Sequence, residues 1–399
     1  MAPTERKQKL SLSETVSPSL SKIKRKKNKK KKVSKSLITT STSHSEKDSV
    51  TVSPSPISKV NVEKAMKKQN DVAMFLAEKV ISAVAENSNF VFSPASINVA
   101  LTMLASVPIE ETLRSSTLSF LRSYSMDELK AVFSEIAAIV LADGSGSGGP
   151  KISNVNGVWM EQSGGVDPSL KDLFENFFKA TFALVDFRFK RHRLYTWKRT
   201  VLQRKMGRKI PKVFDVHLLN GGSVSVPFMT NHKKQYVEQY KGFKVLKLPF
   251  RQSGDTNRQF SMYFYLPDAE DGLNSLVKRV ASSSSTLGFL DSHTPRKQVE
   301  VGLFRIPKFK IDFGFEASSA FKGLNMPSLS LRHKALVEID EDGAEAAAVT
   351  VIMGRGGRGF SSGRRIDFVT DHPFLFMIRE DKTGTVLFVG QIFDPSKSA

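Results

Sequence analysis

The chain of 399 residues is strongly basic, because 60 Lys and Arg outnumber 39 Asp and Glu and give a net charge of +21. It contains no cysteine, which excludes disulfides, thiolate metal sites and cysteine nucleophiles. No run of about 18 apolar residues could span a bilayer, and nothing near Met1 resembles the apolar region of a signal peptide. We therefore expect a soluble, intracellular protein.

The first 60 residues form a basic tail. They hold fifteen Lys and Arg and four acidic residues, so more than half of the net charge lies there. Like-charge repulsion and low hydrophobicity both oppose folding. We expect a disordered tail over 1–60 and one folded domain over 61–399. A plastid transit peptide fits less well, because the tail is dominated by lysine and contains Glu5 and Glu14.

A dense run of basic residues in this tail is a candidate nuclear import signal. It consists of Lys24, Arg25, Lys26, Lys27, Lys29, Lys30, Lys31 and Lys32. Two other interpretations stay open, a solvated charge run and a patch that neutralises nucleic-acid phosphates. The first interpretation implies a nuclear import receptor as a partner and the nucleus as the location, with the cytoplasm as the alternative.

Four helices are predicted in the first half of the domain. The first helix is predicted from apolar residues spaced three and four apart. Each of the other three follows an N-cap motif, either Ser or Asp before proline or a capping box. The predicted ranges are 71–85, 94–104 after Ser93-Pro94, 129–141 after Ser125-Met-Asp-Glu128, and 170–182 after Asp167-Pro168.

Beyond residue 224 the spacing of apolar residues shortens to the alternation that is typical of strands. The predicted strands cover 260–266, 298–306, 309–315, 374–378 and 385–392. Helices followed by a series of strands indicate an α+β fold.

The segment 341–365 has a composition suited to an exposed loop with a movable start. Residues 341–348 combine an acidic pair, a glycine and three consecutive alanines, which can enter a sheet at little cost in side-chain entropy. A short strand is conceivable over 349–353. Residues 354–365 contain five glycines and four arginines and can bury little. We expect a protruding loop that a protease can reach.

Several separated stretches, among them Asn89-Phe-Val-Phe-Ser-Pro-Ala-Ser-Ile, resemble the serpin family, and within it the intracellular plant serpins. They lie at 89–97, 157–160 with 186–187, 218–229, 260–267, 371–376 and 390–395. Together they span most of residues 61–399. The resemblance implies a serpin fold, in which helices pack on a large mixed or antiparallel sheet beside two smaller sheets and an exposed reactive-centre loop at about 341–365.

The family's activity is covalent trapping of proteases. The loop offers a bait bond, the protease forms an acyl-enzyme, and the cut loop inserts as a new strand in the sheet. About ten new ladder hydrogen bonds of ~1 kcal/mol each would favour the inserted state by roughly 10 kcal/mol. The resemblance therefore implies a monomeric inhibitor that is not an enzyme and needs no cofactor or metal.

The resemblance also assigns residues to this activity. The reactive bond is Arg355-Gly356 by pattern, or Gly357-Arg358 by counting from the hinge. An arginine bait implies a trypsin-like serine protease, or an arginine-preferring cysteine protease, as the partner. The mobile hinge comprises Glu341, Gly343, Ala344, Glu345, Ala346, Ala347 and Ala348. The shutter comprises Ser93, Ser96 and His333.

Two departures from the family pattern favour a non-inhibitory serpin as the main alternative. Ala344 stands where many members carry Thr or Ser, and its small side chain should be tolerated. After Phe187 the family has a helix that crosses the sheet, followed by a central strand beside which the cut loop inserts. Only a shorter, basic stretch over 188–213 stands there. We expect that helix, that strand and the asparagine partner of His333 to be missing, which would leave the loop without a neighbour.

Other function classes find less support. The seven histidines form no His-Glu-x-x-His pair, and no Gly-x-Ser-x-Gly elbow or phosphate-loop motif occurs. Gly354-x-Gly-x-x-Gly359 formally matches a dinucleotide fingerprint but lacks the helix and the acidic ribose partner. Residues 355–360 resemble an arginine-glycine box. With the tail, this box makes a nucleic-acid-associated nuclear protein the third hypothesis.

Overall fold

A computed structural model describes most of the chain beyond the tail. The described residues are 59–107, 111–144, 146, 151–186, 194–203, 212–231, 233–250, 256–282, 288–321, 330–339 and 365–397. The chain divides into two units, 1–54 and 55–399. The first unit lies outside the described residues, so the second alone is considered below.

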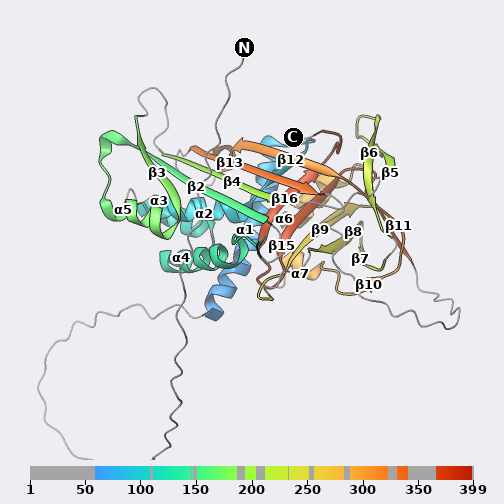
Figure 1. Ribbon diagram of the computed structural model, residues 1–399, viewed down its shortest axis with the longest axis horizontal. Helices are drawn as coiled ribbons and strands as arrows, with labels where there is room; N and C mark the ends of the chain where they lie inside the picture. Colours follow the sequence, from blue (N-terminus) through green and yellow to red (C-terminus); the bar gives the residue numbers. More distant parts are fainter. Residues whose placement is uncertain are drawn as a thin grey trace, which may run out of the picture. The chain divides into compact units, whose positions relative to one another are not determined.

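The helices lie mainly in the first half of the described chain (Figure 1). They are α1 (Lys59–Val84), α2 (Pro94–Ala105), α3 (Glu111–Phe120), α4 (Met126–Glu135), α5 (Pro168–Asp172), α6 (Leu273–Ser282) and α7 (Gly288–Ser292). Single π-helical turns over Ile136–Val140 and Leu173–Phe177 extend α4 and α5.

The strands form three sheets. In spatial order, the seven-stranded sheet holds β1 (Phe90–Phe92), β16 (Val386–Ile392), β15 (Phe374–Glu380), β9 (Phe260–Pro267), β8 (Phe243–Pro249), β7 (Gln235–Tyr240) and β10 (Gln298–Val299). The five-stranded sheet holds β12 (Phe309–Glu316), β13 (Ser330–Ile339), β4 (Leu194–Gln203), β2 (Lys151–Glu161) and β3 (Ala180–Val185). The four-stranded sheet holds β14 (Ile366–Val369), β11 (Val301–Pro307), β6 (Ser223–Thr230) and β5 (Lys212–His217).

The core lies between the helices, the seven-stranded sheet and the five-stranded sheet. Every residue of α2, β9, β15 and β16 is buried. Gly390 of β16 marks a point of close packing, because a Cβ there would overlap the Phe376 ring and come within 2.6 Å of the Phe90 carbonyl oxygen. A side chain at this position would therefore force these strands apart.

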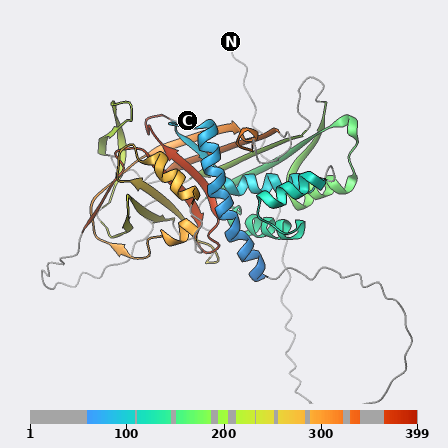
Figure 2. The same ribbon diagram turned by 180° about the vertical axis from the view of Figure 1, so that it is seen from behind.

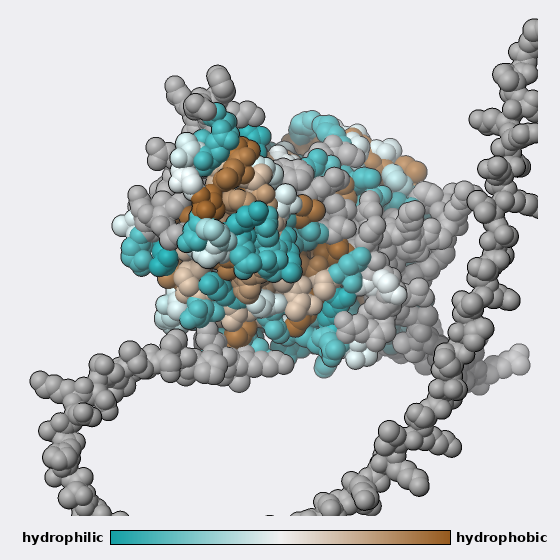
Figure 3. All heavy atoms as spheres, turned by 60° about the vertical axis from the view of Figure 1, so that its left-hand side comes forward, coloured by the Kyte–Doolittle hydropathy of each residue, from teal (hydrophilic) through white to brown (hydrophobic). Residues whose placement is uncertain are grey.

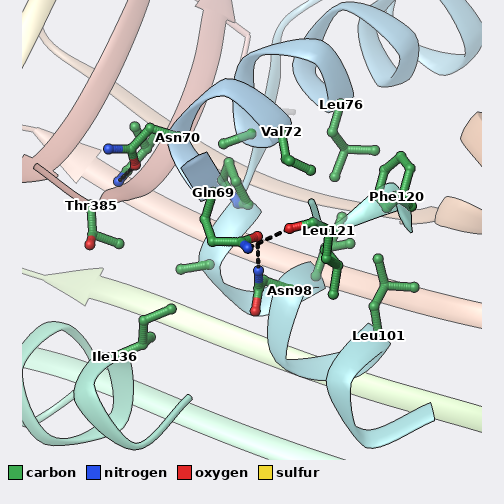
Figure 4. A pocket seen from close by; sticks show the side chains of 15 residues that line it. Gln69, Asn70, Val72, Leu76, Asn98, Leu101, Phe120, Leu121, Ile136 and Thr385 are labelled. Carbon is green, nitrogen blue, oxygen red and sulfur yellow. Dashed lines mark hydrogen bonds between the residues drawn. The ribbon is translucent and has the colours of Figure 1, made fainter. Parts of the chain in front are cut away.

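A small pocket of about 20 Å³ remains where α1 meets α2 (Figure 4). Gln69 of α1 crosses it. Its Nε2 donates to the Leu121 carbonyl at 2.6 Å, and its Oε1 accepts from Asn98 Nδ2 at 2.5 Å. A pocket of this size has room for about one water molecule. The paired amides hold α1 to α2 and to the turn that follows α3.

The N-cap predictions are confirmed. Ser93 Oγ accepts from Ser96 N at 3.2 Å and starts α2 with Pro94 in its first turn. Ser125 Oγ accepts from Glu128 N at 3.1 Å and starts α4. Helix α1 begins at Lys59, earlier than the predicted residue 71, because Ala65 and Met66 are also buried.

The prediction of a helix over 170–182 is wrong in its second half. The helical turns end at Phe177, and Lys179 takes a left-handed φ of 52° before β3 begins. The reason lies in three phenylalanines, at 174, 178 and 182, whose spacing of four residues fits one face of a helix but also one face of a strand.

The expectation that the central strand is missing is also wrong. Strand β4 lies between β2 and β13, antiparallel to the first and parallel to the second. Its register runs from Tyr195 beside Ser330 to Leu202 beside Val337. The short basic stretch after Phe187 therefore still supplies the strand that should neighbour β13.

The connection from β3 to β4 explains how the shorter chain still forms this sheet. Val185 ends β3 beside Glu161, and Leu194 begins β4 beside Met160. The link over 186–193 therefore has to pass only the end of β2, about 10 Å. Eight residues reach that far easily.

Residues of β2 alternate between the two faces of this sheet. Ile152, Asn156 and Val158 are buried against the helices, which lie on one side of the sheet in both ribbon views (Figures 1 and 2). Val155 points the other way and is 50% exposed. Figure 3 turns the β3 and α5 end of the molecule toward the viewer and shows hydrophobic strips between hydrophilic residues.

Candidate functional site

The predicted shutter residues are brought together beneath the five-stranded sheet. Ser93 lies between β1 and α2, and His333 lies in the middle of β13, 240 positions later. The backbone N–H of Ser93 donates to His333 Nε2 at 3.0 Å. Ser93, Ser96 and His333 are all buried. The residues that cap α2 therefore also fasten this helix to a central strand of the sheet.

Aromatic rings enclose the imidazole of His333. The ring of Phe92 meets it edge-on at 6.4 Å between centroids, and that of Phe315 meets it at 5.7 Å. Phe315 is also the residue of β12 in register with His333. Because Nε2 accepts a hydrogen bond it carries no proton, so the neutral ring has its N–H at Nδ1. This packing fixes one orientation of the ring.

The neighbouring strand departs from the pattern implied by the resemblance. The residue of β4 in register with His333 is Lys198, and β4 contains no asparagine. On its other side Lys198 is in register with Asn156 of β2. Asn156 is buried, and its Nδ2 donates to the Phe178 carbonyl at 3.1 Å, while its Oδ1 has no hydrogen-bond partner among the described residues. Strand β4 therefore places a lysine, not an asparagine, beside His333.

The other predicted site residues lie outside the described residues. These are the hinge over 341–348, both alternatives for the reactive bond, the arginine-glycine box and the lysine run of the tail. The structure describes the two strands that flank the loop. Strand β13 ends at Ile339 near the centre of the five-stranded sheet, and β14 begins at Ile366 at the edge of the four-stranded sheet.

Side chains reinforce the attachment of β14 to its neighbour β11. Asp367 Oδ1 accepts from Leu303 N at 2.6 Å, at a point where the register between the strands shifts. The N–H and the hydroxyl of Thr370 both donate to the Arg305 carbonyl, at 3.0 and 3.1 Å. The far end of the loop is therefore anchored by more than backbone pairing.

The described residues contain neither a membrane-spanning helix nor a cluster of metal ligands. No helix there is both long and apolar enough to cross a membrane. In the same part of the chain, no three His, Cys, Asp or Glu side chains lie close enough together to hold a metal ion.

Comparison with known proteins identifies the family. The model of "Serpin (serine protease inhibitor)" matches residues 67–216 and 211–395. The chain belongs to the serpin family. Its fold is the serpin fold, as the resemblance implied.

The similar relatives are plant serpins. Serpin-Z2 of Arabidopsis thaliana is 52% identical over 376 residues, which cover 85% of this chain and 91% of the relative. A protein named "Probable non-inhibitory serpin-Z5", also from Arabidopsis thaliana, is 51% identical over 437 residues, 99% of this chain and all of the relative. Both alignments are longer than the matched part of this serpin, as expected if residues are missing from it.

Solved serpin structures agree with the architecture. Arabidopsis AtSerpin1 in its native stressed conformation is 39% identical and superposes with a TM-score of 0.75, over 84% of this chain and 99% of that one. Maspin, at 15% identity and a TM-score of 0.68, shares the fold.

Proposed function

We propose that this serpin inhibits trypsin-like proteases by offering Arg355 as a bait and inserting its cut loop between β4 and β13. One observation carries the proposal, namely the presence of β4 in register beside β13. These two strands run parallel, and parallel pairing is slightly weaker per residue than antiparallel pairing. A strand folded back from the end of β13 would lie antiparallel to both and pair with each.

The loop has the length and composition for such an insertion. Residues 340–365 connect Ile339 to Ile366, and the hinge part of this segment contains mainly small residues. The two strands share eight register positions, so a new strand between them would find backbone partners on both sides. Partners on both sides matter, because unpaired ladder groups would otherwise oppose insertion.

A second candidate function is that of a non-inhibitory serpin. It is supported by Lys198 at the position in register with His333, where no asparagine stands on β4. It is also supported by the relative whose similarity extends over 99% of this chain, which carries the name "Probable non-inhibitory". In this case the loop would be cut without trapping the protease.

Incubation with trypsin, followed by denaturing electrophoresis and mass analysis, distinguishes the inhibitory from the non-inhibitory function. The proposal predicts a denaturant-stable complex that Arg355→Ala abolishes and that Arg358→Ala leaves intact. Loss only with Arg358→Ala would move the bait to the alternative position. Cleavage after either arginine without any complex would refute inhibition and support the second candidate.

We also propose that the lysine run of the tail directs this serpin to the nucleus. The support is the density of the run, eight Lys and Arg within nine positions. Alanine substitution from Lys24 to Lys32 should shift a fluorescently tagged chain from the nucleus to the cytoplasm. An unchanged nuclear distribution would refute the signal.

A further inference from the structure

The turn between α3 and α4 presents an aromatic side chain to solvent. Tyr124 is 84% exposed, the highest value among the large hydrophobic residues in the described part of the chain. Burial of such a ring is normally favourable, so a tyrosine held in water contributes little to the stability of the fold. The exposure suggests that this ring serves binding.

The turn that carries Tyr124 is rigid. The Glu128 carboxylate is buried and accepts two hydrogen bonds, from Tyr124 N at 2.7 Å and from Ser123 Oγ at 2.5 Å. Gln69 of α1 holds the start of the turn by donating to the Leu121 carbonyl, as Figure 4 shows. A ring on a fixed backbone loses little entropy when it binds a partner.

Backbone strain marks the same turn. Arg122 has a φ of 50°, the left-handed region that favours glycine. Ser123 N donates to the Leu118 carbonyl at 2.9 Å across it, the bond that closes the end of a helix and usually accompanies glycine. An arginine at this position carries backbone strain that a glycine would avoid.

A cation contacts the exposed ring, and further cations lie within one turn of it on α1 and just before Tyr124 in the chain. The Lys68 ammonium lies 4.2 Å from the ring centroid, and Lys64 and Lys67, on the same helix α1, are exposed. Neither Lys64 nor Lys67 makes an ion pair among the described residues. Arg122 is 55% exposed and pairs with Asp71 at 3.4 Å. Helix α1 begins at Lys59, directly after the tail with its many lysines, so the surface and the tail are contiguous along the chain.

We propose that Tyr124, Lys64, Lys67, Lys68 and Arg122 form a binding surface for single-stranded nucleic acid. The cations would contact the phosphates, and a base would stack on the Tyr124 ring. Proteins that bind single strands without sequence preference combine these two features, a cationic path and an aromatic platform. The net charge of +21 would draw such a strand to the protein and make binding depend on salt.

The aromatic ring decides between a single strand and other polyanions. In a duplex the bases are stacked on each other and cannot reach Tyr124, and a sulfated polysaccharide has no flat ring to stack. Charge alone would attract all three. A contribution from Tyr124 is therefore the specific signature of this proposal.

The test measures binding of fluorescein-labelled oligo(dT) of about 15 nucleotides to the full-length protein by anisotropy. Tyr124→Ala should weaken binding about tenfold, a typical effect of losing one stacked base. Tyr124→Phe keeps the ring and should bind within about twofold of the parent protein. A duplex of the same length and heparin should bind both Tyr124 variants equally. Because Tyr124 is exposed, neither change should unfold the protein, which circular dichroism would verify.

A second pair of variants tests the cations. Changing Lys64 and Lys67 together to Gln should reduce the slope of log affinity against log salt by about 1.4, or 0.7 for each phosphate that the protein no longer neutralises. The matched control changes Lys171 of α5 and Lys278 of α6 to Gln. It removes the same charge from other exposed helix positions and should leave the slope unchanged.

Either of two results would overturn the proposal. If Tyr124→Ala binds oligo(dT) as tightly as the parent protein, no base stacks on the ring. If both lysine pairs reduce the slope equally, the protein only attracts polyanions through its net charge. A photo-crosslink from the oligonucleotide to Tyr124 would locate the contact directly.

Discussion

His372 is a buried histidine held between two hydrogen-bond acceptors. Its Nδ1 lies 2.8 Å from Asp371 Oδ1, and its Nε2 lies 2.8 Å from the Pro267 carbonyl oxygen. A neutral imidazole has one N–H and could satisfy only one of them. Burial opposes the charged ring, but the bonds to Asp371 and Pro267, with the charges of Asp371 and Glu270, raise the pKa of His372 above its usual value.

The raised pKa of His372 predicts that stability falls as pH rises. A group whose pKa is higher in the folded state contributes its full stabilisation below the unfolded pKa, about 6.5 for histidine, and loses it as pH rises through the folded pKa. Urea unfolding should therefore show lower stability at about pH 8 than at about pH 6. His372→Gln should lose about 1.5 kcal/mol at the lower pH and flatten this dependence.

The neighbouring carboxylate does not produce this dependence. The hydrogen bond from His372 lowers the pKa of Asp371, so the stabilisation from that carboxylate is constant over the window tested and is lost only in the acid range, as pH falls below its unfolded pKa. A slope that survives His372→Gln would assign the effect to another group.

At the scale of elements, N-cap motifs correctly predicted where two helices begin, whereas apolar spacing did not always predict where a helix ends. Ser93 and Ser125 start α2 and α4 as predicted, because an N-cap acts within four residues of sequence. The helix near Phe178 ends where Lys179 adopts a left-handed conformation. Glycine usually occupies such a position, and no glycine stands nearby in the sequence to predict this helix end. The spacing of apolar residues alone cannot distinguish a helix from a strand there, so the strand over 180–185 was not predicted.

Strand β4 was missed for a different reason. Its sequence, Leu194-Tyr-Thr-Trp-Lys-Arg-Thr-Val-Leu-Gln, contains consecutive basic residues and alternates poorly. Its place is set by two neighbours distant in sequence, β2 and β13, which it joins through ten and eight register pairs. Pairing of this kind depends on tertiary context that a local pattern does not contain.

The shutter was predictable only in part. The resemblance supplied Ser93 and His333, and the structure adds the hydrogen bond that joins them across 240 positions. Phe315 was not predicted as a neighbour of His333. Phe315 lies in a strand predicted from apolar spacing, whereas His333 was assigned through the resemblance. Its position follows from the β12–β13 register, which is fixed only once the sheet has formed.

At the scale of the whole molecule, the β3–β4 connection lies at a point where the fold tolerates a change of length. The end of β3 and the start of β4 lie at the same end of the sheet, separated by one strand, so a shorter connection between them changes neither strand order nor direction. Insertions and deletions are best tolerated at such connections, because no ladder hydrogen bond depends on them.

Whether the five-stranded sheet gains a strand after the loop is cleaved tests whether this shortened fold can still rearrange. If the loop inserts between β4 and β13, about ten new ladder bonds should stabilise the cleaved protein by roughly 10 kcal/mol. A change of this size raises the Tm of a domain of several hundred residues by about 20 °C or more. Thermal unfolding followed by circular dichroism, before and after limited trypsin digestion, measures it.

The control for that experiment is a variant whose hinge resists insertion. Ala346→Pro removes a backbone N–H that an inserted strand would use, so cleavage should proceed while the gain in Tm is largely lost. An equal Tm for cleaved and intact parent protein would mean that β4 and β13 do not separate. The short β3–β4 link would then be compatible with the fold but not with the rearrangement on which inhibition depends.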